Sequence, residues 1–223
     1  MGAIIYLMGI EGPKSPHVAK RKEAMPHKEK WEDKIDYRLH NLGLDRGSVK
    51  GEVLDVGGYQ GEFAALVKAN KLPAHVRVLE PVFKSSYPDI EGDYVRASAQ
   101  DMQGIEDESI DLLVAHNSIP ALFIYEEANI EQSQDDLKRS FSEVVRVLRK
   151  GGRARLGPIT FEGKSDTHRI LKQSLEQNLI ELAKQESVQA SLIPNGQTES
   201  ISDSEPRSEI MVPVFYVSIE KAR

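Results

Sequence analysis

Hydrophobic residues occur along the chain in short runs that are separated by polar segments containing glycine or proline. Runs bounded in this way are typical of buried strands. They predict strands over residues 51–56, 75–80, 94–97, 110–116 and 153–158. Pro81 ends the second of these runs, because proline cannot continue the pairing of a central strand.

Between the strands, hydrophobic residues recur every three or four positions, which is the period of an amphipathic helix. The clearest stripe predicts one helix and consists of Leu137, Phe141, Val144, Val145 and Leu148. Gly151 and Gly152 follow this stripe and predict the end of that helix. Similar stripes predict helices over residues 31–42, from Gly61 to near Asn70, and over residues 166–184.

Residues 1–45 are predicted to form an N-terminal arm and helix outside the main domain. Residues 3–10 are hydrophobic and predict a short strand, or a segment packed on the domain. Residues 11–30 combine lysines and arginines with three prolines, which discourage a continuous helix. The simpler interpretation is a solvated basic segment. The alternative is an arm that closes over the site and meets an acidic substrate.

The C-terminal part begins with a polar stretch at residues 185–209 that contains six serines and two prolines. This composition predicts a long connection, with a short strand near 188–193. Residues 211–219 alternate between hydrophobic and polar positions and predict a final strand. Residues 46–223 are therefore expected to form a single domain.

The predicted strands alternate with helices along most of the chain. Such an order is typical of a doubly wound α/β fold, with a mostly parallel sheet and helices on both faces. Ligands of these folds bind beyond the carboxyl ends of the strands, where the strand order reverses. Polar and glycine residues at those ends are therefore the first candidates for a site.

Composition and charge narrow the function classes. The chain has 223 residues, of which 39% are hydrophobic and 29% are charged. These values are ordinary for a globular protein of one domain. The formal net charge is −6, whereas a dedicated nucleic-acid-binding protein would carry a basic excess. Nucleic acid is therefore an improbable partner.

Cysteine is absent, which excludes disulfides, thiolate zinc sites and cysteine nucleophiles. The six histidines do not show a metal-binding spacing, so no metal is expected. The hydrophobic run at 3–10 is much shorter than the ~20 residues of a spanning helix, and it lacks the features of a signal peptide. We therefore expect a cytoplasmic protein without a membrane partner.

The most informative motif is Asp-Val-Gly-Gly-Tyr-Gln-Gly at residues 55–61, directly after the first strand. Glycines there allow a tight turn and a close approach of the backbone to a ligand. The fingerprint of dinucleotide-binding proteins, Gly-x-Gly-x-x-Gly, would require glycine at Val56. Asp55 would also repel a pyrophosphate, but it can accept a hydrogen bond from the ammonium group of a cofactor that carries an amino acid.

Two further acidic residues follow strands. Glu80 ends the second strand, where a carboxylate can accept both hydroxyls of a ribose. Asp101 and Met102 follow the third strand, where an acid can accept an adenine amino group and a methionine can pack on the ring. Taken alone, Glu80 fits nicotinamide and adenosylmethionine cofactors equally, and it is also compatible with a solvent-exposed carboxylate at the end of a strand. An acid at the position of Asp101, taken alone, is more often an ordinary loop residue.

Five segments together resemble the class I S-adenosylmethionine-dependent methyltransferase family, over residues 51 to about 158. They are Leu-Asp-Val-Gly-Gly-Tyr-Gln-Gly at 54–61, Val-Leu-Glu-Pro at 78–81, Ala-Gln-Asp-Met at 99–102, Ser-Ile-Asp-Leu-Leu-Val at 109–114, and Val-Val-Arg-Val-Leu-Arg-Lys-Gly-Gly at 144–152. Their order and spacing are much more specific than any one of them.

The resemblance implies a sheet of seven strands, the last of them antiparallel. It implies that S-adenosylmethionine is the cofactor and S-adenosylhomocysteine the product, with no metal. The cofactor-binding residues that it implies are Asp55, Gly57, Gly58 and Gly61 at the methionine side, Glu80 with Pro81 at the ribose, and Asp101 with Met102 at the adenine. Tyr59 departs from the pattern, because it occupies the position of the central glycine.

The acceptor side of the predicted site begins at His116, Asn117 and Ser118, after the fourth strand. His116 is the candidate for a general base, or for a residue that contacts the acceptor and the cofactor. A strand-end histidine bonded to the backbone is an equally good interpretation. Tyr37, Phe123 and Tyr125 are candidates for lining an acceptor pocket, although aromatic residues more often serve packing. Residues 1–45, 117–131 and 158–166 are expected to build this pocket.

The sequence therefore predicts an enzyme that transfers a methyl group from S-adenosylmethionine to a small-molecule acceptor. A non-catalytic protein of the same fold, acting as a cofactor-binding or partner subunit, is the alternative. A nicotinamide-dependent oxidoreductase is disfavoured by the register of the glycines. A protein or nucleic-acid acceptor would use the basic arm at 14–30, and a homodimer is compatible with the sequence.

Overall fold

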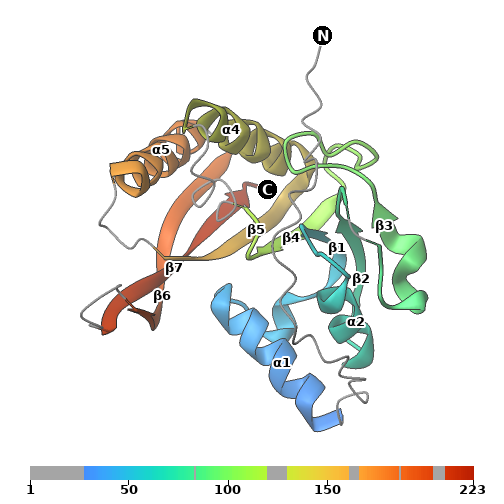
Figure 1. Ribbon diagram of the computed structural model, residues 1–223. Coiled ribbons are helices and arrows are strands. Elements are labelled where there is room, and N and C mark those ends of the chain that lie inside the picture. The colour runs from blue at the N-terminus through green and yellow to red at the C-terminus, as the bar shows by residue number, and fades with distance from the viewer. Residues whose placement is uncertain (1–27, 83, 120–129, 161–165, 186, 203–208) are drawn as a thin grey trace, which may run out of the picture.

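A seven-stranded sheet forms the centre of the structure, a computed structural model that describes residues 28–82, 84–119, 130–160, 166–185, 187–202 and 209–223. The strand order is β3-β2-β1-β4-β5-β7-β6 (Figure 1). The strands are β1 (Gly51–Val56), β2 (Ala74–Leu79), β3 (Tyr94–Val95), β4 (Ile110–His116), β5 (Leu148–Thr160), β6 (Val188–Ser202) and β7 (Glu209–Lys221). β7 runs antiparallel to both of its neighbours, and the other described pairs are parallel. The predicted sheet is confirmed.

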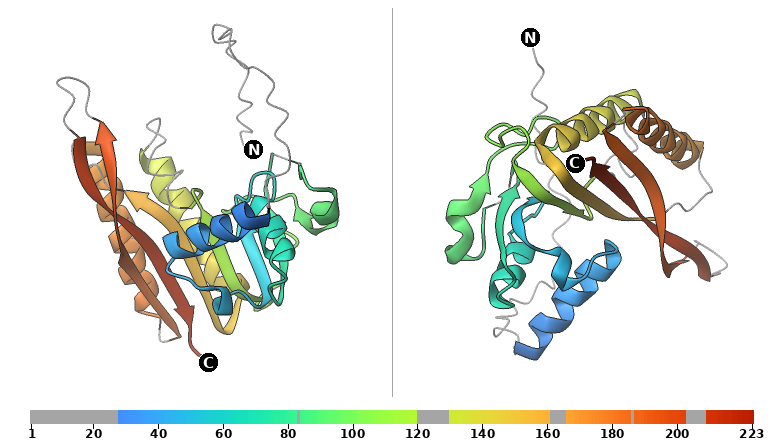
Figure 2. Two further views of the ribbon diagram at one scale, coloured as in Figure 1. Left: turned by 90° about the horizontal axis from the view of Figure 1, so that it is seen from below. Right: turned by 180° about the vertical axis from the view of Figure 1, so that it is seen from behind.

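Helices cover both faces of this sheet (Figure 2). α1 (Lys28–Asn41) and α2 (Glu62–Ala69) lie on one face, and α4 (Ile130–Val147) and α5 (Asp166–Ala183) lie on the other. Two hydrophobic clusters fill the layers between helices and sheet. β1 contributes Leu54 to the cluster under α4 and α5, and Val53 to the cluster under α1 and α2. Because both faces of the central strands are buried, these strands appear in the sequence as continuous runs of hydrophobic residues.

Gly151 and Gly152 do not end α4 as the sequence predicts. β5 begins at Leu148 and includes both glycines, and its register with β4 shifts at this point. A Cβ atom on Gly152 would lie 2.8 Å from the carbonyl oxygen of Ile110. The glycines therefore permit an irregular, tightly packed start of β5. Glycine pairs occur both at helix ends and at irregularities in strands, so the sequence alone did not distinguish the two.

The prediction of a long connection at residues 185–209 is wrong. β6 extends from Val188 to Ser202 and pairs with β7 along most of its length, with a shift in register between Pro194 and Thr198. Its polar residues misled the prediction because β6 is the last strand in the sheet order. An edge strand of this kind gains its stability from ladder hydrogen bonds and does not need a hydrophobic run.

The first helix begins earlier than the sequence predicts. α1 starts at Lys28, so the last three residues of the predicted basic segment are helical. The rest of that segment and the hydrophobic run at 3–10 lie outside the described residues.

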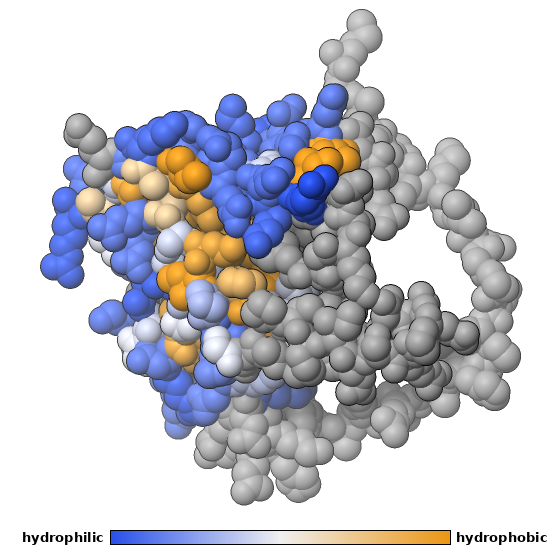
Figure 3. Space-filling view, turned by 90° about the vertical axis from the view of Figure 1, so that its left-hand side faces the viewer, coloured by the Kyte–Doolittle hydropathy of each residue, from blue (hydrophilic) through white to orange (hydrophobic). Residues whose placement is uncertain are grey.

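No helix within the described ranges is both long and hydrophobic enough to span a membrane. The side of the molecule with α5 and β6 shows mainly hydrophilic residues, with hydrophobic ones gathered in a strip (Figure 3).

His75 connects the edge of the sheet to the turn that leads into β3. Its Nδ1 lies 2.9 Å from Oε2 of Glu52 on β1, and its Nε2 lies 3.1 Å from Oδ1 of Asp93. Hydrogen bonds to Glu52 and to Asp93 raise the pKa of His75 above its ordinary value of 6.5. The protonated imidazole therefore donates to two carboxylates on separate elements.

We predict that this interaction stabilises the fold in acid more than in base. Because the pKa of His75 is higher in the folded state, its contribution is present below pH 6.5 and is lost as the pH rises through the folded value. Replacing His75→Gln should therefore lower the free energy of unfolding at pH 6 more than at pH 9, as measured by urea denaturation. The Glu52→Gln variant should weaken this pH dependence, and an equal effect of His75→Gln at both pH values would contradict the assignment.

Candidate functional site

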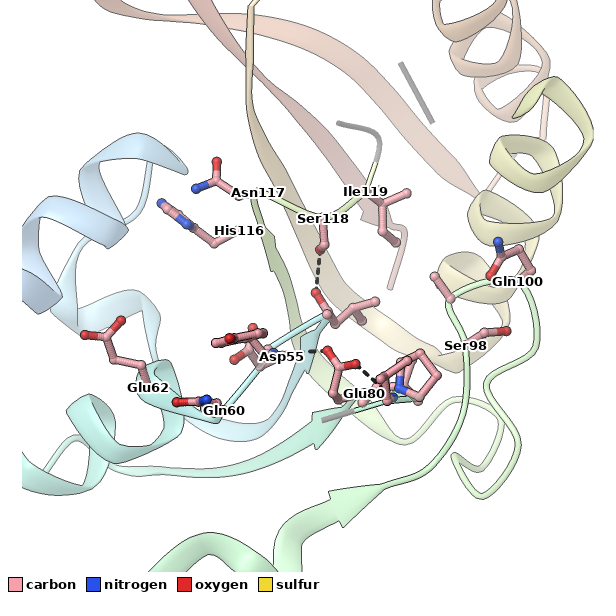
Figure 4. Close-up of a pocket in the computed structure, with 18 of the residues that line it drawn as sticks. Asp55, Gln60, Glu62, Glu80, Ser98, Gln100, His116, Asn117, Ser118 and Ile119 are labelled. Atoms are coloured by element: carbon pink, nitrogen blue, oxygen red, sulfur yellow. Dashed lines mark hydrogen bonds between the residues drawn. The ribbon is translucent and has the colours of Figure 1, made fainter. Parts of the chain in front are cut away.

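A cavity of about 990 Å³ lies beyond the carboxyl ends of β1, β2 and β4 (Figure 4). This is the edge of the sheet at which doubly wound folds bind their ligands. Its lining includes six of the predicted site residues, namely Asp55, Gly57, Gly58, Glu80, Pro81 and His116. The structure thus brings together residues that are as many as 61 positions apart in the sequence.

The turn after β1 is packed too closely for larger side chains. A Cβ atom on Gly57 would lie 2.5 Å from the Cβ of Ser118, and one on Gly58 would lie 2.4 Å from Oδ2 of Asp55. The amide of Gly57 also donates to the carbonyl of Leu79 at 2.8 Å, which ties the turn to β2. Glycine at both positions therefore allows the backbone to pass between the ends of β1, β2 and β4.

Tyr59 adopts the left-handed conformation that its position in the turn requires. Its φ angle is 52°, and its side chain is 52% exposed. Its amide donates to Oε2 of Glu80 at 3.2 Å, and its carbonyl accepts a hydrogen bond from the hydroxyl of Tyr94 at 3.0 Å. These two contacts hold the backbone in a conformation that costs a residue other than glycine ~1–2 kcal/mol. The loop is therefore formed despite the missing glycine.

Asp55 is a carboxyl group enclosed by protein. Its residue is 1% exposed, and its Oδ2 has no hydrogen-bond partner within the described residues. Burial raises its pKa to about 7, with Arg38 opposing the rise and Glu80 adding to it. An unpaired carboxylate is costly in such an environment, so the group is ready to accept a cationic ligand that stabilises its charge.

Glu80 is oriented by the backbone on both sides of it. Its Oε2 accepts from the amide of Tyr59, and its Oε1 accepts from the amide of Val82 at 3.0 Å. The residue is 6% exposed, and Figure 4 shows the carboxylate between the glycine turn and the start of the following loop. A carboxylate accepts hydrogen bonds at both of its oxygens, so a group held at this position suits a ligand with two neighbouring hydroxyl groups.

His116 lies at the opposite end of the cavity, together with Asn117 (Figure 4). Its Nε2 is buried and has no hydrogen-bond partner in the described part of the chain. Burial lowers its pKa to about 4, and the nearby Arg38 lowers it further, while Glu62 opposes the shift. The imidazole is therefore neutral near pH 7 and is a weak base. Its free ring nitrogen can exchange a hydrogen bond with a ligand.

Residues 117–119 continue the wall after β4. The amide of Asn117 donates to the carbonyl of Gly157 at 2.9 Å, and Asn117 has a φ angle of 56°. The hydroxyl of Ser118 donates to the carbonyl of Val56 at 2.5 Å. These contacts fix the loop between β1 and β5 where it faces the cavity. Pro120, Phe123 and Tyr125 lie outside the described residues, and Tyr37 is 62% exposed and does not line the cavity.

Three predicted site residues are not part of the cavity lining. Met102 is completely buried in the cluster under α4 and α5, because its side chain fills the core, so its predicted contact with a ring is wrong. Asp101 is exposed and accepts a hydrogen bond from Gln103. Ser98, Ala99 and Gln100 form that part of the wall instead. Gly61 faces Ile90 and Tyr94, where it leaves room for their side chains.

The sequence did not single out Arg38, Gln60, Glu62 and Asp136 as lining residues, although Arg38 lies within the range 1–45 that was expected to contribute to the acceptor pocket. Arg38 belongs to α1 and Asp136 to α4, which are remote in sequence from the strand ends. Charged residues on a helix ordinarily indicate only a solvated face, so no sequence signal distinguished these two. Gln60 and Glu62 lie within or next to the glycine motif, whose spacing was the available signal.

Residues 54–156 match the family model described as a methyltransferase domain. No curated protein sequence matches the chain significantly. Among solved structures, the plantazolicin methyltransferase BpumL in complex with a monoazolic desmethylPZN analog and SAH is similar, with a TM-score of 0.52 and 13% identity over 89% of this chain and 91% of that chain. A SAM-dependent methyltransferase from Leishmania major is similar with a TM-score of 0.50 and 15% identity, over 85% of this chain and 73% of that chain.

The chain carries a methyltransferase domain, and this domain has the class I fold. The matched region begins at Leu54, one residue before Asp55, and ends at Leu156 in β5. It therefore contains the glycine turn, Glu80 and His116. Arg38 and the rest of α1 lie outside it, as do α5, β6 and β7. The resemblance inferred from the five sequence segments is confirmed.

We predict that the glycine turn tolerates no side chain at Gly57. Its φ angle of 68° and the 2.5 Å approach to Ser118 together should make Gly57→Ala strongly destabilising in thermal unfolding. Gly196→Ala is the matched control, because Gly196 has a φ angle of 79° and nothing within 4 Å of its Cβ position. The control isolates the backbone strain of ~1–2 kcal/mol. Equal losses in the two variants would show that the close approach does not matter.

We also predict that Asp55 makes the folded state less stable as the pH rises. Its pKa is about 7 in the folded protein and 3.8 in an unfolded chain, so the folded state retains a proton between these values. The free energy of unfolding should therefore fall across this window, by as much as about 4 kcal/mol. Asp55→Asn should remove this slope, so that the variant gains stability relative to the wild type from pH 5 to pH 8. A constant difference in urea denaturation would contradict the burial of the charge.

Proposed function

We propose that this protein is an enzyme that transfers a methyl group from S-adenosylmethionine to a small-molecule acceptor. The observation that supports this most directly is the enclosed Oδ2 of Asp55, which has no hydrogen-bond partner among the described residues and lies at the glycine turn of a methyltransferase domain. Both similar structures described above are methyltransferases, and one of them contains SAH. The fold alone would not specify the function, so the residues of the cavity must support it.

The residues of the cavity fit the parts of this cofactor. Asp55 would accept a hydrogen bond from the ammonium group of the methionine portion, which would supply the positive charge that its buried carboxylate lacks. Gly57 and Gly58 line the cavity beside it, and neither carries a side chain that could cover this part of the wall. Glu80 would accept the two ribose hydroxyls, and Pro81 continues the wall next to it.

The adenine portion would lie between the loop after β2 and the loop after β3. Val82 lines the cavity and is 68% exposed, so a flat ring can cover it. Ser98 and Gln100 offer polar groups on the other side (Figure 4). These residues take the place of Asp101 and Met102, which the structure puts outside the cavity lining.

When bound, S-adenosylmethionine would supply a methyl group on a sulfonium, which would pass to a lone pair of the acceptor with the carbon–sulfur bonding electrons left on sulfur. The protein's part is to hold the two reactants in line and to exclude water, at an approach of ~3–3.5 Å. Asp55, Glu80 and the glycine turn would fix one reactant. His116 and Asn117 would position the other, from the opposite end of the cavity.

His116 would act as a hydrogen-bonding contact to the acceptor. Its pKa of about 4 makes it a poor match for a general base near pH 7, because efficient proton transfer needs a pKa close to the working pH. Its buried Nε2 has no hydrogen-bond partner among the described residues, so an acceptor that reached it would satisfy this nitrogen. The acceptor would therefore be a nucleophile that reacts without a strong protein base, or one whose proton passes to water.

The volume of the cavity favours a small acceptor. Pockets for single small ligands measure about 300–1,000 Å³, and this cavity of about 990 Å³ is at the upper end of that range. It therefore has room for the cofactor and for a second, compact molecule beside it. A large macromolecular acceptor would have to insert a single side chain or base at the His116 end.

We predict that Glu80→Gln lowers the affinity for S-adenosylhomocysteine at least tenfold, about 1.4 kcal/mol, because an amide replaces one ribose acceptor by a donor. Isothermal titration calorimetry of the purified protein measures this, with NAD as the ligand that should not bind. Glu181→Gln on α5, whose side chain bonds to Lys184 on the surface, is the matched control. Unchanged affinity in both Glu80→Gln and Asp55→Asn would rule out the assigned cofactor site.

His116→Ala should leave the affinity for S-adenosylhomocysteine within twofold of the wild type, because its side chain lies at the acceptor end of the cavity. The same titration measures it. A loss of ten times or more would instead place His116 among the cofactor contacts.

A further inference from the structure

The acceptor end of the cavity is bounded by charged residues from α1 and α2. Arg38 is the residue of the described part of α1 that lines the cavity. It donates a hydrogen bond to Oε2 of Glu62, at the start of α2. Lys34, one turn earlier on α1, donates to Oε1 of the same carboxylate at 3.2 Å. Two cations of α1 therefore share one carboxylate of α2.

This sharing leaves a positive charge at the acceptor end. Lys34 and Arg38 together carry two positive charges, and Glu62 carries one negative charge. His116 adds none near pH 7, because its pKa is about 4. The other lining acids are Asp55, Glu80 and Asp136. Asp55 and Glu80 belong to the cofactor side in the function proposed above, and Asp136 comes from α4, across the sheet from α1.

The Arg38 side chain lines the cavity and is more buried than that of Lys34. It is 23% exposed, compared with 52% for Lys34. Its charge lowers the pKa of both Asp55 and His116, which come from different strands that meet at the cavity. A guanidinium in this position can bind the two oxygens of an anionic group at once, as arginine does with carboxylates and phosphates.

We propose that Arg38 determines acceptor specificity, and that the acceptor is a small organic anion whose carboxylate or phosphate binds the Arg38 guanidinium. The inference rests on the function proposed above, since it names the class of molecule that enters beside the cofactor. The anionic group anchors the acceptor, and His116 and Asn117 contact the part that receives the methyl group. Glu62 occupies the guanidinium when the acceptor is absent and competes with its anionic group.

Other acceptor charges fit this end less well. A cationic acceptor would meet the Arg38 guanidinium, and the Glu62 carboxylate that pairs with this guanidinium already binds two cations. A neutral acceptor would leave the surplus charge without a counter-charge in a partly enclosed site, where such charges are poorly screened. An anion removes the surplus.

The ion pair could instead serve only to hold α1 against α2, and the two roles predict different results. If the pair is structural, Arg38→Gln and Glu62→Gln should change ligand binding in the same direction. If Arg38 binds the acceptor, Arg38→Gln should weaken anion binding, whereas Glu62→Gln should strengthen it by removing a competitor. The sign of the second effect separates the roles.

The experiment uses three probes of similar shape and different charge, which are benzoate, benzamide and benzylamine, and inorganic phosphate as a second anion. The full-length protein is first titrated with S-adenosylhomocysteine by calorimetry. The probes are then added to the saturated protein, and binding is followed by the NMR signals of the His116 imidazole. We expect benzoate or phosphate to bind at least tenfold more tightly than benzamide and benzylamine.

The variants complete the test. Arg38→Gln should weaken anion binding at least tenfold, and Glu62→Gln should strengthen it severalfold. Arg46→Gln is the matched control, because Arg46 pairs with Asp36 on the surface at 2.7 Å and does not line the cavity. Its anion affinity should equal that of the wild type.

Two results would overturn the inference. One is binding of benzylamine or benzamide as tight as that of both anions, and the other is a loss of anion binding in Glu62→Gln as large as in Arg38→Gln. Failure of the proposed function is seen separately, as an absence of S-adenosylhomocysteine binding in the first titration. The probes are then titrated without it, so that the role of Arg38 is still decided.

Discussion

A buried carboxyl group and a tight backbone turn meet at the end of β1, and the architecture of the site depends on how they fit together. Gly58 passes so close to Oδ2 of Asp55 that a Cβ atom there would lie at 2.4 Å. Gly57 leaves equally little room beside Ser118, which connects the turn to β4. Gly58 therefore packs directly against Asp55, and burial of this carboxyl group raises its pKa to about 7. A group that is costly to ionise when the site is empty is well suited to a cationic ligand.

The central part of the fold is predictable from the sequence for a definite physical reason. β1 and β4 are buried on both faces, so residues such as Leu54 and Leu113 on one face and Val53 on the other produce uninterrupted hydrophobic runs. The glycine turn and Glu80 follow from these strands, because the carboxyl ends of parallel strands meet at one edge of the sheet. The sequence therefore predicts that residues at the ends of these strands lie close together.

Other parts depend on tertiary contacts that leave little trace in the sequence. β6 is polar and is stabilised by pairing with β7, so it resembled a connection. Met102 follows a strand as a ligand-contacting residue would, but the core beneath α4 takes its side chain. Arg38 is one of several charged residues on α1, and nothing in the helical pattern shows that it reaches the cavity. The part of the cavity wall that is built from strand ends was thus readable in part, and the part that comes from helix surfaces was not.

The most direct test of this account is the number of protons released when the cofactor product binds. At pH 6, Asp55 is mostly protonated in the free protein because its pKa is about 7. If the ammonium group of S-adenosylhomocysteine stabilises the carboxylate, binding should release roughly one proton. Calorimetric titrations at pH 6 in two buffers with different ionisation enthalpies measure this number, and the account predicts that Asp55→Asn abolishes the release. Binding heats that are equal in the two buffers for the wild type would contradict the role of Asp55.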